Sequence, residues 1–391
     1  MKNQELLLVP GPTPVVDEIY DALASETRGH TDPRFVETFK RAIENTKQLF
    51  QTDGEVYIVA GSGTFAMEMA IVNTVARGER LLVISHGYFG DRFTPLAKAF
   101  GIEVDVLQAR WGEHIDLALV QQALRENVYK AVTITHADTS TGVSSDLDKL
   151  IPLIKATGAL VIVDGVVATA ALQEDMSKAY GGNEHYKIDI VLTGSQKAIG
   201  IPPGLAIVAF SKQALAARAQ MESVPAYYAD IENWRPIMNN PALYFATPPV
   251  NLIYAYDVAL QMVLQEGMKQ REVRHIAFGK AIRAALSTYG MMPLAKEDVA
   301  APTLSCILYP EGVDDAKFRA SLANQGVIVA GALAHLAGKA FRIGHMGKTT
   351  ASMLEQAVSC IGKSLQEQGI HANIEEALHA FSEQMELSVR S

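Results

Sequence analysis

Seven apolar segments, each five to seven residues long, limit the possible folds of this chain more than any other feature. Stretches with the periodicity of amphipathic helices separate most of them. Such an alternation is typical of a mainly parallel sheet that is covered by helices on both faces. The predicted strands are residues 56–60, 80–85, 103–108, 131–135, 159–163, 188–193 and 204–210. We therefore expect an α/β fold around a mostly parallel seven-stranded sheet.

Beyond residue 250 the pattern changes. A long helical stretch over about 250–288 leads into short strands and helices that predict a small α+β domain. Its expected elements are residues 303–308, 314–324, 327–330, 341–343, 350–368 and 373–387. The predicted organisation is an N-terminal segment (1–15), a large domain (16–260) and a small C-terminal domain (261–391).

Charge and composition argue against several classes of function. A net charge of −9 over 391 residues, without a basic cluster, disfavours nucleic acid as a partner. The first residues lack a signal-peptide pattern, and Asp164 interrupts the longest apolar stretch, so we expect no membrane span. Two cysteines, Cys306 and Cys360, allow at most one disulfide and lack the spacing of metal ligands. A cytoplasmic protein is the simplest interpretation.

A lysine follows closely after the sixth predicted strand. Lys197 lies among small residues in the short segment 193–200, and Pro202–Gly204 comes next. Lysine is almost never fully buried unless it is paired. Presented at the end of a buried strand, its amine can form a Schiff base with a carbonyl group, such as that of pyridoxal phosphate (PLP). A lysine that begins a surface loop is the competing interpretation.

An acidic residue occupies the corresponding place after the fifth predicted strand, where Asp164 ends an apolar run. Ligands of open α/β sheets bind outside the carboxyl ends of the strands. A carboxylate there can pair with a protonated pyridine nitrogen. Alternatively, an aspartate after a strand caps the next helix.

A glycine-rich turn follows the first predicted strand. Ser62, Gly63 and Thr64 come just before a helical pattern, and a helix N-terminus of this kind binds phosphate. The segment also matches the Gly-x-Gly-x-x-Ala pattern of dinucleotide-binding folds. That pattern needs an acidic residue about 20 positions later, whereas the next strand ends in Ser85 and His86. A phosphate site is therefore favoured over a dinucleotide site.

Together these motifs resemble those of the class V aminotransferases of PLP fold type I, in particular the alanine–glyoxylate / serine–pyruvate group. The resemblance extends from Leu8–Pro14 to Phe341–Gly347, and its most specific motif is Gly194–Ala198 followed by Pro202–Gly204. It implies a PLP-dependent homodimer whose large domain binds the cofactor. It also implies that the N-terminal segment lies near the small domain and the active site.

The resemblance implies roles for twelve residues. Lys197 would form the Schiff base, and Asp164 would pair with the pyridine nitrogen. Arg342 would bind the substrate carboxylate, which its planar guanidinium fork suits. The other implied cofactor contacts are Ser62, Gly63, Thr64, Phe89, Ser140, Val166 and Gln196, with Tyr244 and Thr247 reaching the phosphate of the neighbouring subunit.

Several of these residues also have simpler interpretations when they are taken alone. Phe89 and Tyr244 are typical of core aromatics, and Thr247 is typical of a helix cap. The segment around Ser140 is also compatible with a polar turn. Arg342 is also compatible with a structural ion pair.

The implied reaction moves an amino group from a small amino acid, with alanine or serine favoured, to glyoxylate or pyruvate. Aspartate and ureidoglycine stay open as donors, because Ala332 and Leu333 stand where many relatives have glycine and glutamine. A cysteine desulfurase is disfavoured because neither cysteine lies in an expected loop, and phosphoserine aminotransferase because no extra basic residues are recognised. A catalytically silent scaffold is the remaining alternative, against which the presence of Lys197, Asp164 and Arg342 argues.

Overall fold

A seven-stranded sheet forms the centre of the computed structural model, which describes residues 5–390. Its strand order is β2-β10-β9-β8-β5-β3-β4. In chain order these strands are β2 (Glu55–Ala60), β3 (Arg80–Ser85), β4 (Glu103–Gln108), β5 (Ala131–Thr135), β8 (Leu160–Asp164), β9 (Ile190–Gly194) and β10 (Leu205–Phe210). All seven predicted strands are confirmed, with ends that differ by at most two residues.

The sheet is mixed, as a mostly parallel sheet allows. β10 runs antiparallel to both of its neighbours, β2 and β9. The remaining neighbours pair in parallel. β5, β8, β9 and β10 are buried along their whole length, which explains why they read as continuous apolar runs rather than as alternating patterns.

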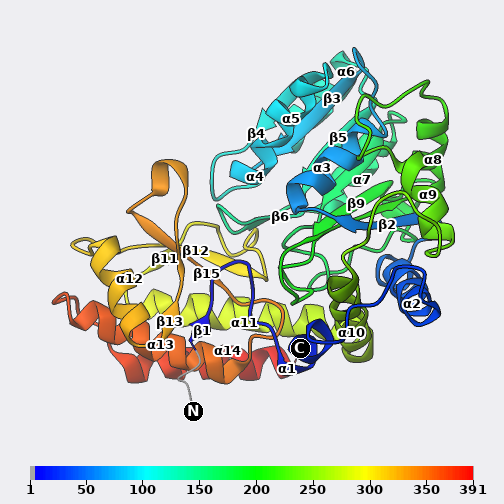
Figure 1. The fold of residues 1–391 in the computed structure, drawn as a ribbon. Helices are drawn as coiled ribbons and strands as arrows, with labels where there is room; N and C mark the ends of the chain where they lie inside the picture. Colours follow the sequence, from blue (N-terminus) through cyan, green and yellow to red (C-terminus); the bar gives the residue numbers. More distant parts are fainter. Residues whose placement is uncertain (1–4, 391) are drawn as a thin grey trace.

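Most helices from the first two thirds of the chain cover this sheet, whereas the first of them packs against the last, away from the sheet (Figure 1). They are α1 (Asp17–Leu23), α2 (Pro33–Phe50), α3 (Gly63–Val72), α4 (Tyr88–Asp91), α5 (Phe93–Ala99), α6 (Leu117–Glu126), α7 (Leu147–Lys155), α8 (Lys212–Ala219), α9 (Ile231–Asn239) and α10 (Val250–Glu266). A 3₁₀ turn, η1 (Tyr180–Gly182), and a short hairpin, β6 (Ala137–Asp138) and β7 (Val143–Ser144), complete this part. α3 packs on β9 and β10, and α2 and α9 pack on β2.

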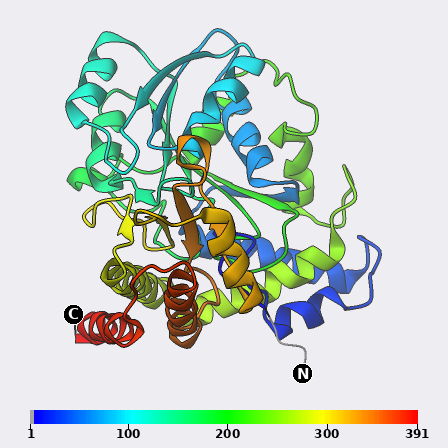
Figure 2. The same ribbon diagram turned by 90° about the vertical axis from the view of Figure 1, so that its left-hand side faces the viewer.

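The C-terminal part contains a second, four-stranded sheet of order β11-β12-β15-β14. Its elements are α11 (Met268–Thr288), β11 (Met292–Pro293), β12 (Leu304–Leu308), α12 (Asp315–Asn324), β13 (Val327–Ile328), β14 (Ala330–Gly331), η2 (Ala334–Leu336), β15 (Ala340–Gly344), α13 (Ala351–Gln366) and α14 (Ile374–Arg390). Figures 1 and 2 show α11, α13 and α14 together on the side away from the seven-stranded sheet.

The N-terminal segment joins this C-terminal part. β1 (Leu6–Leu7) pairs in parallel with β13, and the Gly344 amide donates to the Leu8 carbonyl (2.7 Å). The predicted position of this segment beside the C-terminal sheet is therefore confirmed.

The single helical stretch predicted over about 250–288 is wrong in one respect. Gly267 separates α10 from α11 with φ of +83°, a left-handed conformation that an α-helix does not contain. Its amide still donates to the Val263 carbonyl, so α10 ends there and α11 starts in a new direction.

Two large groups of buried apolar side chains form the interior. One surrounds the seven-stranded sheet and includes α10, and the other lies between the four-stranded sheet and α11, α12, α13 and α14. The division into segments 1–15, 16–260 and 261–391 stays a prediction. Within residues 5–390, the chain has no helix that combines the length and apolarity needed to cross a bilayer.

A buried ion pair connects one strand of the central sheet with two of the helices around it. Lys155 Nζ lies 2.7 Å from Asp189 Oδ2, and both side chains are at most 3% exposed. The same carboxylate accepts from the Val161 amide (2.8 Å) and the Ser211 hydroxyl (3.2 Å). It therefore connects α7, β8 and the start of α8.

We expect Asp189→Ala to lower the free energy of unfolding by roughly 3–5 kcal/mol, because it leaves the Lys155 ammonium buried without a counter-charge. Lys212→Ala is the matched control, because Lys212 pairs with Asp53 where both side chains are more than 70% exposed. It should cost no more than about 1 kcal/mol. Urea unfolding at neutral pH measures both changes, and equal losses would contradict the assigned role.

Candidate active site

One pocket at the carboxyl edge of the seven-stranded sheet collects eight of the twelve predicted site residues. Five more residues from the same edge complete its lining. The predicted ones are Ser62, Gly63, Thr64, Phe89, Asp164, Val166, Gln196 and Lys197, and the others are Met67, Arg92, Ala137, Thr139 and Val167. The fold thus brings together segments that lie up to 135 residues apart in the sequence.

Lys197 follows β9 in a turn that the N-terminal segment holds. The Thr13 hydroxyl donates to the Lys197 carbonyl (2.7 Å), and Lys197 Nζ donates to the Pro10 carbonyl (2.6 Å). Gly11 lies so close that an added Cβ would be 2.3 Å from Lys197 Cδ, and its φ is +100°. The lysine is therefore half-buried beneath the N-terminal segment, and its amine faces the pocket.

The Lys197 amine is less basic than an ordinary lysine. Burial and, to a smaller extent, the positive charge of Arg342 lower its pKa to about 8, although the negative charge of Asp164 opposes both effects. A substantial fraction of the side chain is then neutral near pH 7–8. A neutral amine is the form that attacks carbonyl groups and accepts protons.

Asp164 ends β8, the strand beside β9. It is 3% exposed, and its carboxylate accepts a hydrogen bond from the Val166 amide (3.0 Å). Burial raises its pKa to about 7, against the effect of that hydrogen bond. Within residues 5–390, no cation lies within ion-pair distance of it, so a positively charged partner in the pocket would stabilise its ionised form.

The glycine-rich turn forms the start of α3, as the sequence predicts. Ser62 caps the helix by accepting from the Phe65 amide (3.4 Å), so the amides of the first turn point toward the pocket side. Gly63 packs against Val166, since an added Cβ would lie 3.0 Å from its Cγ2. Gln196 Oε1 is buried without a hydrogen-bond partner. The free amides of the first helical turn can donate to an anion, whereas the Gln196 oxygen is an acceptor and would need a donor from a ligand.

Phe89 reaches the pocket from α4, and an acidic residue that the sequence analysis did not select fixes this turn. The Asp138 carboxylate accepts from the Phe89 and Gly90 amides (both 3.0 Å) and from the Ser140 hydroxyl (2.6 Å). Asp138 and Ser140 are both fully buried. The signal in the sequence was the Asp138–Ser140 spacing, which is typical of an Asx turn.

Ser140 does not line the pocket. Its hydroxyl oxygen accepts from the Tyr88 amide (2.9 Å), which places it behind the turn that carries Phe89. Direct contact between Ser140 and a cofactor stays a prediction.

Arg342 lies on β15, at the edge of the site but outside the pocket lining. Its Nε donates to the Gly331 carbonyl (2.9 Å) and its Nη1 to the Thr139 carbonyl (3.3 Å). The part of the chain that the structure describes contains no carboxylate paired with it, so the structural ion pair considered above is not formed. Burial lowers its pKa. The guanidinium is oriented and still has capacity for a carboxylate ligand.

Tyr244 and Thr247 lie outside the pocket. Both are exposed, and the Tyr244 ring lies 5.3 Å from that of His30. Their expected contact with a neighbouring subunit stays a prediction.

Neither cysteine is suited to nucleophilic chemistry. Cys306 lies on β12, directly opposite Arg342 on β15, and is 1% exposed. Burial raises the pKa of its thiol to about 12, so it stays protonated. Cys360 is buried in α13. Among residues 5–390 there is also no cluster of three or more His, Cys, Asp or Glu side chains that could hold a metal ion.

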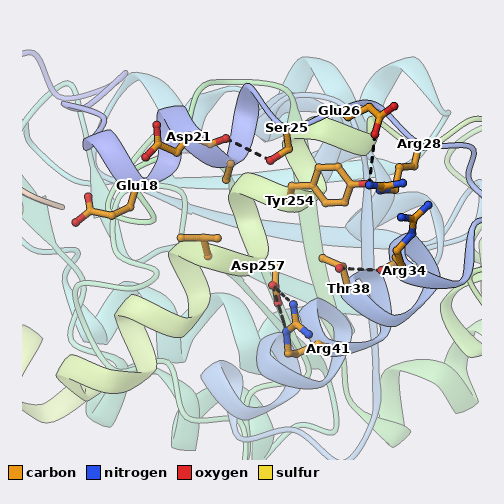
Figure 3. A pocket seen from close by; sticks show the side chains of 12 residues that line it. Glu18, Asp21, Ser25, Glu26, Arg28, Arg34, Thr38, Arg41, Tyr254 and Asp257 are labelled. Carbon is orange, nitrogen blue, oxygen red and sulfur yellow. Dashed lines mark hydrogen bonds and ion pairs between the residues drawn. The ribbon is translucent and has the colours of Figure 1, made fainter.

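A second cavity lies between α1, α2 and α10 and contains three arginines (Figure 3). Arg41 pairs with Asp257 (2.5 Å), Arg34 with Asp32 (2.7 Å) and Arg28 with Glu26 (3.4 Å). Because each guanidinium already has a carboxylate partner, this cavity offers no unpaired positive charge, in contrast to the site around Lys197.

A comparison with family models decides what kind of site this is. The model described as "Aminotransferase class-V" matches residues 12–346, which include all twelve predicted site residues. The chain belongs to the class V aminotransferase family. The predicted reaction class, transfer of an amino group, is confirmed by this membership.

Curated relatives of this class V aminotransferase cover nearly the whole chain. An uncharacterized aminotransferase of Methanocaldococcus jannaschii is 36% identical over 94% of each chain. A chain named the small subunit of a soluble hydrogenase, from a Synechococcus species, is 34% identical over 94% of this chain and 95% of its own. A serine–glyoxylate aminotransferase of Methylorubrum extorquens is 33% identical over 93% and 92%.

Solved structures confirm the fold. The ureidoglycine–glyoxylate aminotransferase of Bacillus subtilis superposes with a TM-score of 0.90 over 98% of both chains at 24% identity. An alanine–glyoxylate aminotransferase of a Nostoc species has a TM-score of 0.86 and 28% identity over 93% of this chain and 95% of its own. The predicted α/β class and the fold of the PLP-dependent aminotransferases are therefore correct.

We expect Asp164→Asn to change the pH dependence of stability in cofactor-free protein. The pKa of Asp164 is raised from 3.8 to about 7 on folding, so between these values the folded state binds more protons than the unfolded state. Wild-type stability contributed by this group is therefore lost as pH rises through that window. As pH rises from about 4 to 8, the free energy of unfolding of the asparagine variant should increase relative to that of wild type by on the order of 4 kcal/mol. Urea unfolding across this range measures the difference, and a difference that is constant with pH would refute the assignment.

Proposed function

We propose that this chain is a PLP-dependent aminotransferase that moves an amino group from a small amino acid to a small 2-oxo acid. The observation that carries the proposal is the meeting of Lys197 and Asp164 in one pocket. Each has a pKa displaced by burial, and each lacks an ion-pair partner among the described residues. Perturbed titratable groups of this kind are typical of catalytic sites.

The pocket fits PLP in three respects. The start of α3, with Ser62 and Thr64, suits a phosphate dianion. Asp164 lacks a cation, which a protonated pyridine nitrogen would supply. Val166 and Phe89 both line the pocket as apolar surfaces for a flat ring. When bound, PLP would supply an electron sink for the negative charge that develops on the substrate α-carbon.

The chain's own residues would hold the cofactor, move protons and orient the reacting groups. Asp164 would keep the pyridine nitrogen protonated, because its carboxylate would gain a cationic partner in a buried site. Lys197 would hold the cofactor through Nζ, and its free amine would accept the proton from the substrate α-carbon as general base and donate it again as general acid. The Pro10 carbonyl, which accepts from Nζ in this structure, orients the free amine. The N-terminal segment, which the Thr13 hydroxyl ties to the Lys197 carbonyl, would limit the access of water to the lysine.

Arg342 would bind the substrate carboxylate. It lies close enough to Lys197 to lower the pKa of that amine, and its remaining N–H donors have no carboxylate partner among the described residues. We favour alanine or serine as donor and glyoxylate or pyruvate as acceptor. One relative named for serine, one for alanine and one for aspartate are 33%, 33% and 30% identical, so aspartate and also ureidoglycine stay alternatives.

We also propose a cytoplasmic homodimer with shared active sites. The exposed Tyr244 and Thr247 lie outside the pocket of their own subunit, where they are free to complete the phosphate site of a second copy. Light scattering of the purified protein tests the assembly, and a monomer that retains full activity would contradict it.

The visible spectrum of the PLP-loaded protein tests the proposed reaction. We expect the cofactor band to disappear when the true donor is added and to return with glyoxylate or pyruvate. Alanine, serine, aspartate and ureidoglycine are added separately, so the response identifies the donor. Lys197→Ala should abolish turnover entirely, because no other side chain in the pocket lining offers an amine.

Arg342→Gln gives the matched comparison for substrate binding. It should retain the cofactor band of the wild type but need roughly 10- to 100-fold more donor for the same change, because a charge-assisted hydrogen-bond pair is lost. A wild-type band that no donor perturbs would support the silent scaffold instead. Turnover by Lys197→Ala would overturn the assigned mechanism.

A further inference from the structure

Arg92 lines the same pocket but belongs to none of the roles assigned so far. It follows directly after α4, so it lies less than one helical turn beyond Phe89. Its Nη1 donates to the Thr64 hydroxyl (2.9 Å), and its guanidinium carbon lies 4.9 Å from the centre of the Phe89 ring. One side chain thus contacts both the glycine-rich turn and the aromatic platform.

The contact with Thr64 determines what that hydroxyl can do. A hydroxyl group has one donor and two acceptor positions. Because the Thr64 oxygen accepts from Arg92, its own O–H remains available for an acceptor in the pocket. Without the arginine, a threonine in the first turn of a helix can turn its hydroxyl toward nearby backbone groups instead. Arg92 therefore favours the rotamer that offers a donor to an anion.

The contact with Phe89 fixes the second element of the site. A guanidinium over an aromatic face is an attractive cation–π arrangement. Since an aromatic ring has two faces and Arg92 covers one, a flat ligand can stack only on the other. The planar Arg92 guanidinium contacts both Thr64 and Phe89. It thereby restrains the distance between the glycine-rich turn and the free face of the Phe89 ring.

The charge of Arg92 is also available to the pocket. Over residues 5–390, Arg92 has no carboxylate within ion-pair distance, whereas Arg34 and Arg41 are both paired. Its positive charge acts against the burial that raises the pKa of Asp164. An unpaired guanidinium beside a helix N-terminus adds to the attraction for a dianion.

We propose that Arg92 is a positioning residue for the phosphate of the cofactor: through Thr64 it presents a hydroxyl donor to that phosphate, and through Phe89 it holds the ring platform in register with it. This inference rests on the proposed PLP-dependent function. Arg92 is thereby assigned to the phosphate end of the cofactor and not to its ring alone.

The test compares two ligands in cofactor-free protein, PLP and pyridoxal, which lacks the phosphate. Dissociation constants are measured by absorbance titration for wild type, Arg92→Gln, Thr64→Val and the double variant. We expect Arg92→Gln to weaken PLP about 10- to 100-fold and pyridoxal less than about threefold, because a hydrogen bond to a charged group is lost only with PLP. The double variant should lose less PLP affinity than the product of the two single losses, because both changes remove the one interaction that Arg92 and Thr64 share.

Three results would overturn the inference while leaving the proposed function intact. These are unchanged PLP binding by Arg92→Gln, an equal loss for PLP and pyridoxal, and losses that multiply in the double variant. Failure of the wild type to bind PLP would instead refute the proposed function itself. Should Arg92→Gln not fold, Arg92→Lys carries the same comparison, since a single ammonium cannot both donate to Thr64 and lie flat on Phe89.

Arg125→Gln is the matched control. Arg125 is exposed on α6 and does not line the pocket. It removes one positive charge of the same kind, so it should leave both dissociation constants within about twofold of wild type. An equal loss of PLP binding in this variant would mean that net charge, and not the position of Arg92, is responsible.

Discussion

The parallel pairing of β8 with β9 is the constraint on which the rest of the site depends. In this register Asp164 lies opposite Leu192, so both strands deliver their following residues to the same edge of the sheet. The acid ends one strand, and the lysine turn follows the other. Neither position relies on a flexible loop, because both strands are buried along their whole length. An acid and an amine can therefore share one pocket with little freedom to move apart.

The same burial that fixes these groups makes them reactive. Asp164, Lys197 and Arg342 come from three different strands or the turns after them, and each has a pKa shifted in the direction that burial of its charged form predicts. Such groups oppose folding unless they are paired. The structural arginines around α1, α2 and α10 are instead matched with carboxylates. The contrast between paired and unpaired charges separates the ion pairs around α1, α2 and α10 from the candidate active site.

Much of this arrangement could be predicted from the sequence, for identifiable reasons. Strands buried on both faces appear as continuous apolar runs, so their ends were placed within two residues, and motifs adjoining those ends were placed with them. The break at Gly267 was missed because it depends on one backbone angle inside a helical pattern. Arg92 was missed because its importance lies in its contacts with Thr64 and Phe89, which its place in the sequence does not indicate. The spacing of Asp138 from Ser140 indicated a local turn but not the contact with the Phe89 amide. Ser140 supports the turn that carries Phe89 through the Tyr88 amide, and its direct contact with a cofactor stays a prediction.

The N-terminal segment connects the C-terminal part of the molecule to the lysine turn through a short stretch of chain. It is paired with β13 at Leu6–Leu7 and hydrogen-bonded to the Lys197 turn through Pro10 and Thr13. Between these anchor points only a few residues span the gap, so the segment has a fixed length rather than a free one. The segment therefore links the position of β13 to that of the lysine turn. The beginning of the chain consequently restrains the position of the Lys197 turn. Inserting or deleting a single residue there would move the lysine and so alter its chemistry.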